Sequence, residues 1–386
     1  MPTSEVYLDH AASTVVRAAS KAAWAAAVEA HHANPTGAHK AARSARRALD
    51  DARDLIAEMV GRDPAEAVFT SGGSEADNLA VRGVLAARGG TAVCSAGEHH
   101  AVLEPVEHAD GLTVGLDAKG QVTPQALADT LKAADDVSVV SIIAVNNETG
   151  AVNDLPALAQ VVREHAPGAL FHTDAVQALS WIDLAPAVAD VDMVSITGHK
   201  VGGPIGTGVL FVRAGIELEA QILGGGQERG RRAGTPDVAG AAAFAAAVKA
   251  TVERRPDEVV RLGGLRDRLV DGLVDRLGSA VVPTLLGRGH DSEVAAGIAH
   301  ICLDGVEAEA LLFLLDAQGL RASAASSCSS GAQDPSHVLA AMGVPRELAA
   351  GSLRLSLGHS STPADVETAL EIIPPAVKRL LRHGGG

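Results

Sequence analysis

The chain has 386 residues, of which 47% are hydrophobic, many of them alanine, and only 2% are aromatic. This length exceeds what one compact core usually organises, so we expect two domains, and the apolar share argues against disorder. The formal net charge of −15 opposes nonspecific attraction to nucleic-acid phosphates, and few aromatic side chains are present to stack on bases. Direct nucleic-acid binding is therefore not expected.

The first residues and the cysteines indicate the compartment. The segment MPTSEVYLDH has no basic region followed by an apolar run, and no later apolar stretch is long enough to cross a bilayer. We therefore expect a cytoplasmic protein without membrane contact. Cys94, Cys302 and Cys328 are widely spaced and form no CxxC pair, which predicts neither a disulfide framework nor a metal site.

Helical and strand-like segments alternate through the first two thirds of the chain. Alanine-rich helical patterns cover residues 15–32 and 38–59. Apolar runs with strand character follow near residues 66–70, 91–95, 138–145, 169–172, 190–196 and 207–212. Because helical segments separate most of these runs, the order predicts parallel strands joined by right-handed helical crossovers. In such folds ligands bind beyond the carboxyl ends of the strands, so functional residues should come just after strands.

The last third of the chain has a different pattern. A charged helical stretch covers about 237–277. After it come strand signals near 279–283, 298–303 and 352–357, a helix near 306–316, and a final helix from about 363. We therefore predict a large domain of residues 15–257 and a smaller domain of residues 1–14 and 258–386.

Lys200 comes after one of the predicted strands. The segment from Asp192 to Lys200 has the pattern of a buried strand that ends in a small polar turn, and the glycine-rich run 201–208 follows it. The chain has seven lysines, and the other six lie on helix faces or in a turn. Lys200 is thus either a solvated loop residue or an amine that forms a Schiff base with an aldehyde cofactor.

Two more segments deliver polar groups to the same sheet edge. A short strand precedes Asp174 and Gln177, and a carboxylate there can keep a pyridine nitrogen protonated, or it can cap the next helix. The run from Ser71 to Asn78 combines a strand end, a small-residue turn and a helix start, which suits a phosphate. Many turns share this last pattern, so it is weak evidence alone.

Taken in order, these segments resemble the class V aminotransferase-like family of fold-type I pyridoxal phosphate (PLP) enzymes, and within it the cysteine desulfurases. The match covers nearly the whole chain. It includes Tyr7-Leu-Asp-His-Ala-Ala-Ser, Asn34-Pro-Thr-Gly-Ala-His, Ser71-Gly-Gly-Ser-Glu-Ala-Asp-Asn, Glu98-His-His-Ala-Val-Leu, Asn146-Asn-Glu-Thr-Gly, Gly198-His-Lys, Gly224-Gly-Gly-Gln-Glu-Arg-Gly and Ser352-Leu-Arg-Leu-Ser-Leu-Gly. The resemblance implies an α/β fold with a large, mainly parallel-sheet domain flanked by helices, a smaller α+β domain, and a homodimer.

The resemblance also implies roles at the cofactor site. Lys200 would form the internal aldimine with PLP, Asp174 would pair with the pyridine nitrogen, and His99 would stack on the ring and relay protons. Asn147 and Gln177 would contact the phenolic oxygen of the cofactor. The phosphate would be bound by five residues, the last of them from the partner subunit: Gly73, Ser74, Thr197, His199 and Thr235.

Arg354 matches the arginine that binds the substrate carboxylate in this family, and Asn34 would assist it. A planar guanidinium suits this task because it can donate two parallel hydrogen bonds. Considered alone, Arg354 would more often be a structural ion-pair partner, and the resemblance favours the substrate role.

The cysteines divide into two kinds. Cys94 and Cys302 lie in apolar runs and are expected to be buried and inert. Cys328 lies in the small, polar segment 323–332, where a nucleophile could approach a substrate, accept an atom and move to a partner. The resemblance makes Cys328 the persulfide-forming cysteine of the longer-loop group. Ala325 stands where that group has glycine, so positive φ should be lost there and the reach of the loop reduced.

By this resemblance the enzyme removes sulfur from L-cysteine, releases L-alanine, and forms a persulfide on Cys328 for transfer to a protein acceptor. Two alternatives stay open: a lyase or selenocysteine-specific enzyme that needs no protein nucleophile, and a non-catalytic scaffold that has kept the cofactor shell. The destination of the sulfur is also open, among iron–sulfur cluster assembly, tRNA thiolation, DNA phosphorothioation and biosynthesis.

Overall fold

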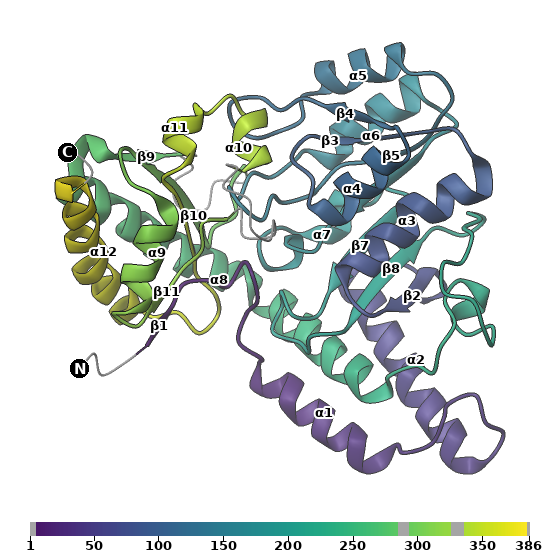
Figure 1. The fold of residues 1–386 in the computed structure, drawn as a ribbon. Helices are drawn as coiled ribbons and strands as arrows, with labels where there is room; N and C mark the ends of the chain where they lie inside the picture. The colour runs from purple at the N-terminus through teal and green to yellow at the C-terminus, as the bar shows by residue number, and fades with distance from the viewer. Residues whose placement is uncertain (1–4, 285–292, 326–335, 384–386) are drawn as a thin grey trace.

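The structure is a computed structural model that describes residues 5–284, 293–325 and 336–383 (Figure 1). Seven strands within these ranges form the central sheet. Their spatial order is β2 (Ala67–Thr70), β8 (Gly208–Val212), β7 (Met193–Thr197), β6 (Leu170–Asp174), β5 (Val137–Ser141), β3 (Thr91–Ser95) and β4 (Leu112–Val114). From β7 to β4 every neighbouring pair is parallel, whereas β8 is antiparallel to both of its neighbours.

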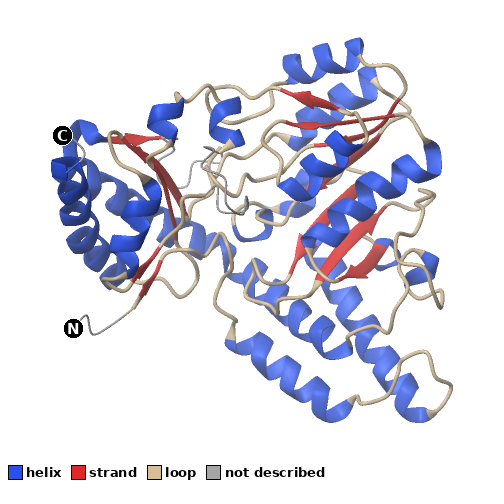
Figure 2. Cartoon of the chain, in the orientation of Figure 1, coloured by secondary structure: helices blue, strands red, loops and turns tan. Residues whose placement is uncertain are grey.

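The orientation of β8 is an exception to the parallel arrangement that the alternation of helices and strands predicts, within a sheet expected to be mainly parallel. β7 and β8 are joined by residues 198–207, which contain turns and no helix. A parallel neighbour needs a crossover of a dozen or more residues, which this connection is too short to provide. The predicted α/β class itself is confirmed, with a mainly parallel sheet between layers of helices (Figure 2).

Helices cover both faces of the central sheet. Val93 packs into the core on one face and the next residue, Cys94, into the core on the other, because successive strand residues point in opposite directions. One face is covered by α3 (Gly73–Arg88) and α4 (His100–His108). The opposite face is covered by α2 (Lys40–Val60), α5 (Pro124–Ala133), α6 (Leu155–His165), α7 (Leu184–Ala187) and the first part of α8 (Val238–Leu277), against which α1 (Ala18–Ala30) packs. Burial on both faces explains the nearly continuous apolar runs of these strands.

A second core lies toward the other end of α8. Within the described ranges, three antiparallel strands form its sheet in the order β12 (Ser352–Ser356), β10 (Ile298–Leu303) and β9 (Val281–Pro283). A short parallel pair, β1 (Val6–Tyr7) with β11 (Leu320–Arg321), lies beside them. Helices α9 (Ala308–Asp316) and α12 (Pro363–His383) pack into this core, whereas α10 (His337–Ala341) and α11 (Arg346–Ala349) form a small separate cluster with Cys302 of β10. Leucine and isoleucine side chains from α8, α9, β10, β12 and α12 fill the core.

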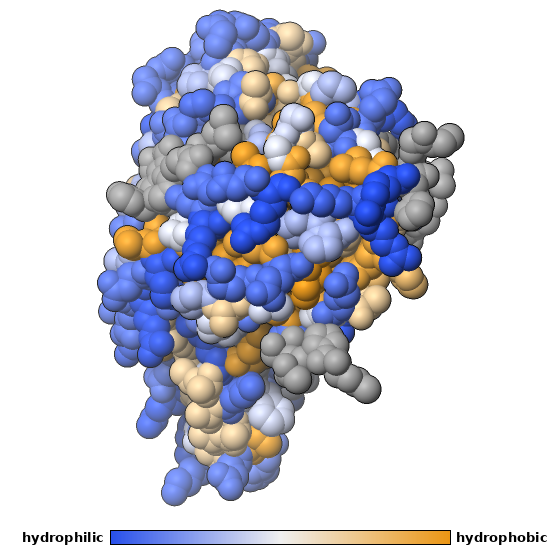
Figure 3. All heavy atoms as spheres, turned by 90° about the vertical axis from the view of Figure 1, so that its left-hand side faces the viewer, coloured by the Kyte–Doolittle hydropathy of each residue, from blue (hydrophilic) through white to orange (hydrophobic). Residues whose placement is uncertain are grey.

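Helix α8 belongs to both cores. Residues from Val238 to Val248 pack under the central sheet, and Leu262 to Leu273 pack under the smaller one. Figure 1 shows this helix in green, running from one part of the molecule into the other. The face that carries α9 and α12 is largely hydrophilic, with apolar side chains showing between the polar ones (Figure 3). No helix of the described ranges meets the length and apolarity that a membrane crossing requires.

Candidate active site

A pocket of about 290 Å³ lies at the carboxyl ends of the central strands and also contacts the smaller sheet. Ten of the residues singled out in the sequence line it: Gly73, Ser74, His99, Asn147, Asp174, Gln177, Thr197, His199, Lys200 and Arg354. They come from distant parts of the chain and meet because parallel strands deliver their following loops to one edge.

Lys200 lies in the turn after β7, and its side chain enters the pocket. Its amine donates hydrogen bonds to the carbonyls of Ala11 and Ala12, the latter at 2.9 Å. The amide of Gln177 donates to the same Ala11 carbonyl at 2.6 Å. The segment between β1 and α1 therefore forms the wall that holds this amine in place.

Asp174 is the last residue of β6 and is only 3% exposed. Burial raises its pKa to about 6, while the hydrogen bond from the Val176 amide and the positive charge of Lys200 act in the opposite direction. One carboxylate oxygen, Oδ1, accepts that amide at 2.8 Å, so Asp174 does bond to the following turn. The side chain also lines the pocket, where a protonated pyridine nitrogen would stabilise its negative charge.

The first turn of α3 faces the pocket through Gly73 and Ser74. A Cβ on Gly73 would lie 2.7 Å from Cγ2 of Val176, so this position has room only for glycine. The positive end of a 16-residue helix favours an anion at this point. Two more of the residues predicted for the phosphate, Thr197 and His199, line the same pocket.

His99 caps the start of α4, because its Nδ1 accepts the Ala101 amide at 3.1 Å. Since Nδ1 accepts, the neutral ring carries its proton on Nε2. Burial, assisted by the nearby charges of Lys200, His100 and His337, lowers the pKa of His99 to about 4. The ring is therefore neutral at pH 7 and can stack on another ring without adding a charge.

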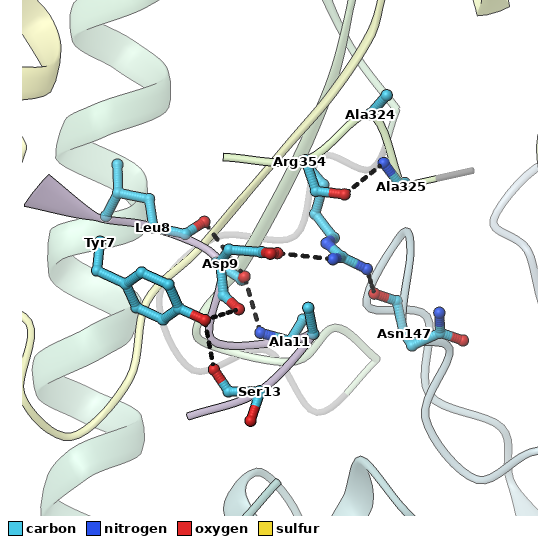
Figure 4. Close-up of polar contacts among 12 residues, drawn as sticks. Tyr7, Leu8, Asp9, Ala11, Ser13, Asn147, Ala324, Ala325 and Arg354 are labelled. Carbon is cyan, nitrogen blue, oxygen red and sulfur yellow. Dashed lines mark hydrogen bonds and ion pairs between the residues drawn. The ribbon is translucent and has the colours of Figure 1, made fainter. Parts of the chain in front are cut away.

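Arg354 lies on β12, is 3% exposed, and forms two hydrogen bonds drawn in Figure 4. Nη1 donates to the carbonyl of Asn147 and Nη2 donates to Oδ1 of Asp9, both at 2.8 Å. Its Nε has no hydrogen-bond partner within the described part of the chain. Arg354 is thus a structural ion-pair partner and a pocket residue at once, so the two interpretations are compatible.

Three predicted residues do not line the pocket or cannot be placed. Asn34 and Thr235 are exposed and lie outside the lining. Cys328 lies outside the described residues. The segment that carries Thr235 is fixed to its own subunit by a buried ion pair, because Arg53 donates to both carboxylate oxygens of Glu228 at 2.8 and 2.9 Å.

Ala325 lines the pocket and has a φ of +67°. The expectation that alanine would lose positive φ here is therefore wrong. The backbone is held by two hydrogen bonds: the Ala325 amide donates to Oγ of Ser323 at 3.0 Å, and Oγ of Ser352 donates to the Ala324 carbonyl at 2.8 Å. A left-handed alanine costs roughly 1–2 kcal/mol, which these local bonds help to offset.

The sequence alone missed several pocket residues, of which Asp77 carries the most chemistry. A signal for it existed, because Asp77 comes four residues after Gly73 on α3 and residues at this spacing share a helix face. Ile143, Val145 and Val176 supply apolar walls that a sequence pattern does not assign to a site.

The predictions for Cys94 and Cys302 are confirmed. Both side chains are buried, with 0% and 1% exposure, and burial raises the pKa of each thiol. Neither thiol is ionised at neutral pH, so neither is a ready nucleophile.

Buried His300 should make stability depend on pH. Its ring is 4% exposed, bonds to Thr284 and Ser352, and has its pKa lowered to about 3 by burial and by the charge of Arg354. In the unfolded chain histidine binds a proton near pH 6.5, so falling pH favours unfolding. His300 should then cost about 2 kcal/mol of stability between pH 7 and pH 5.

Urea unfolding at both pH values tests this expectation. His300→Gln should lose less stability on acidification than the parent, by about 2 kcal/mol. The control His32→Gln, at an exposed position, should keep the parental pH dependence. An unchanged pH dependence in His300→Gln would show that His300 is not the group concerned.

The lining fits pyridoxal phosphate. It offers an amine for the aldehyde, a buried carboxylate for the pyridine nitrogen, and a helix start for the phosphate. The fold and the pocket therefore define a pyridoxal phosphate enzyme of fold type I.

Comparisons with known proteins agree. The chain matches the model of the aminotransferase class-V family over residues 6–369. It is 42% identical to the IscS-like cysteine desulfurase of Mycobacterium tuberculosis over 97% of both chains, and 35% identical to the cysteine desulfurase IscS of Methanosarcina thermophila over 97% of this chain and 92% of that one. A solved NifS-like protein, 28% identical, has a TM-score of 0.89 and covers 97% of this chain and 100% of its own.

The chain belongs to the class-V aminotransferase family. The resemblance to cysteine desulfurases is confirmed, and the cofactor of the family is pyridoxal phosphate.

Proposed function

We propose that this protein is a cysteine desulfurase, which converts L-cysteine to L-alanine and keeps the sulfur as a persulfide on Cys328. The observation that carries the proposal is that Lys200, Asp174, Arg354 and Ala325 line one pocket. Cys328 is three residues from Ala325, and three residues span at most about 11 Å. The names of the relatives at 42% and 35% identity support the same activity.

Each residue has a task that its position supports. Pyridoxal phosphate, when bound, supplies the electron sink for a carbanion at the substrate Cα. Arg354 binds the substrate carboxylate, Lys200 takes the Cα proton, and Asp174 keeps the ring nitrogen protonated. The thiolate of Cys328 then attacks the substrate sulfur: an S–S bond forms, the Cβ–S bond breaks, and its electron pair stays with the carbon skeleton that becomes alanine.

The remaining assignments at the cofactor are part of the same proposal. His99 stacks on the ring, and Asn147 and Gln177 face the phenolic oxygen, since all three line the pocket. Gly73, Ser74, Thr197 and His199 bind the phosphate from within the subunit.

A homodimer would complete the site. Thr235 is exposed and outside its own pocket, so it is free to reach the phosphate in a second copy, and Asn34 is likewise exposed and would assist at the substrate. The segment that precedes Thr235 presents apolar surface, with Leu223 82% exposed and Ile222 43% exposed. Burial of such side chains between copies would stabilise the dimer.

We extend the proposal to domain organisation and cellular context. The two cores support a division into residues 15–257 and residues 1–14 with 258–386, with the boundary inside α8. A cytoplasmic location and a protein sulfur acceptor follow from the same activity. The destination of the sulfur, whether iron–sulfur clusters, tRNA thiolation or another product, is a property of that acceptor.

Replacement of Cys328 by serine tests the proposed nucleophile. Cys328→Ser should keep the visible absorbance of the bound cofactor, because no described cofactor contact is removed, and should form no persulfide on the protein after addition of L-cysteine. Mass spectrometry of the intact protein measures the added sulfur.

The matched control is Cys94→Ala, which removes a buried thiol and should leave persulfide formation intact. Undiminished sulfide release by Cys328→Ser would instead indicate a lyase that needs no protein nucleophile. A pure protein without a cofactor spectrum would indicate a scaffold.

A further inference from the structure

A row of polar side chains lies buried beside the pocket on three adjacent strands. Ser141 is on β5, His172 on β6 and Ser195 on β7, and all three are 0% exposed. Nδ1 of His172 lies 2.8 Å from Oγ of Ser141, and its Nε2 lies 2.9 Å from Oγ of Ser195. Burial lowers the pKa of His172 to about 3, so the ring is neutral and only one nitrogen carries a proton.

Asp77 joins this row from α3. It is 1% exposed and has Oδ1 3.8 Å from Nε2 of His172. The hydroxyl of Ser195 is close enough to lower the pKa of Asp77, against the effect of burial. Oδ1 has no hydrogen-bond partner within the described part of the chain, and the residue lines the cofactor pocket. The row therefore ends at a carboxyl group that the proposed mechanism does not yet use.

Asp77 and Asp174 line the same pocket. Because two negative charges repel each other strongly in a buried site, ionising both carboxyls costs more free energy than ionising one. Asp174 has the Val176 amide and the positive charge of Lys200 to stabilise its anion. Asp77 has a neutral His172 and a serine, and burial together with the charge of Asp174 raises its pKa well above the usual range.

Glu98 is a third buried carboxyl near this pair, and its Oε1 accepts the Ile143 amide at 2.6 Å. Burial and the charge of Asp174 raise its pKa as well, with a smaller effect from Asp77. Of the three carboxyls, Asp174 is therefore the one that the surroundings favour as an anion.

We propose that Asp77 is a positioning residue that remains a neutral carboxylic acid, so that Asp174 is the single carboxylate facing the pyridine nitrogen. A protonated Asp77 can donate toward Oγ of Ser195. The neutral ring of His172 donates at one nitrogen and accepts at the other, to Ser141 and Ser195. Oδ1 of Asp77 is left as an uncharged acceptor in the pocket wall.

Infrared spectroscopy at pH 7 tests the proton on Asp77 without any turnover. The parent apoprotein should show the carbonyl stretch of a buried carboxylic acid, and Asp77→Asn should remove part of it. Glu98→Gln should remove a different component of the carbonyl band, which distinguishes the contribution of Glu98 from that of Asp77. Asp129→Asn is the matched control, because the side chain of Asp129 is 62% exposed and should contribute no such band. An acid band unchanged in Asp77→Asn overturns the proposal.

The holoenzyme gives a second, spectroscopic test, which rests on the proposed cofactor. The pH titration of the visible cofactor absorbance should keep its midpoint in Asp77→Asn, because the amide is as neutral as the acid. If Asp77 were an anion in the parent, its removal would shift the midpoint by roughly one pH unit or more. Asp77→Ala, which removes the polar contact with Ser195 and His172, should shift the titration while circular dichroism confirms the fold, and the amide of Asp77→Asn should restore it. Failure of cofactor binding in every variant and in the parent would reject the proposed function, whereas the infrared result would still decide the state of Asp77.

Discussion

Lys200→Ala should abolish turnover and the visible absorbance of the cofactor. The pocket contains no other lysine among the described residues, so no second amine can replace it. Loss of a covalent anchor and of the base for the Cα proton should lower kcat by about 10⁴ or more. Absorbance spectra of the purified protein and alanine release from L-cysteine measure the two effects.

Lys200→Arg is the matched control, since it keeps a cation beside the carbonyls of Ala11 and Ala12 but offers no primary amine. It should bind the cofactor without the absorbance of the covalent linkage and should also be inactive. Reduction with borohydride followed by mass spectrometry should find the cofactor attached to the parent protein only. An attached cofactor in Lys200→Ala would place the linkage elsewhere.

Arg354→Gln should lower kcat/KM for cysteine by roughly 10² to 10³ and also reduce stability. The first effect follows from loss of a bidentate, charge-assisted contact to the substrate carboxylate. The second follows because Asp9 loses its 2.8 Å partner, and breaking a buried ion pair costs about 3–5 kcal/mol. Asp9 is partly solvated, with 24% side-chain exposure, so the lower end of this range is expected.

Asp9→Asn separates the two effects. It keeps the guanidinium in the pocket and removes only the charge that pairs with Nη2, so stability should fall while most of kcat/KM is retained. Steady-state kinetics and urea unfolding of both variants make the comparison. Equal losses of kcat/KM in the two variants would mean that Arg354 serves structure alone.

The sequence predicted the larger elements because their patterns are long. The helices from Lys40 to Val60 and from Val238 to Leu277 carry several turns of periodic apolar positions. Three of the strands of two or three residues, β1, β4 and β11, were not predicted, because segments this short show no period and depend on tertiary pairing. Strand direction at β8 depended on the length of one connection, which the apolar pattern does not encode.

Site residues could be predicted where an ionisable side chain follows a buried strand, because such a position has few structural explanations. Lys200 and Asp174 stood out for that reason, and the pocket brings them together. Asp77 was missed because it lies past the first turn of α3, and an acidic residue inside a helix is common on a solvated face. The pairing of Arg354 with Asp9 joins residues 345 positions apart, a contact that no local pattern indicates.

Helix α8 joins the large core to the small core, and its rigidity limits how far the two cores can move relative to each other. Pro256 lies within it, between the residues that pack into the two cores, and proline removes a backbone hydrogen bond where a helix bends most easily. From Pro256 to Leu277 the helix is about 32 Å long, so a bend of about 2° moves its far end by about 1 Å. Lys200 follows β7 of the central sheet, and Arg354 lies on β12 of the smaller sheet. The stiffness of this helix, together with the direct bond from Arg354 to the Asn147 carbonyl, thus limits how far the spacing between Lys200 and Arg354 can vary.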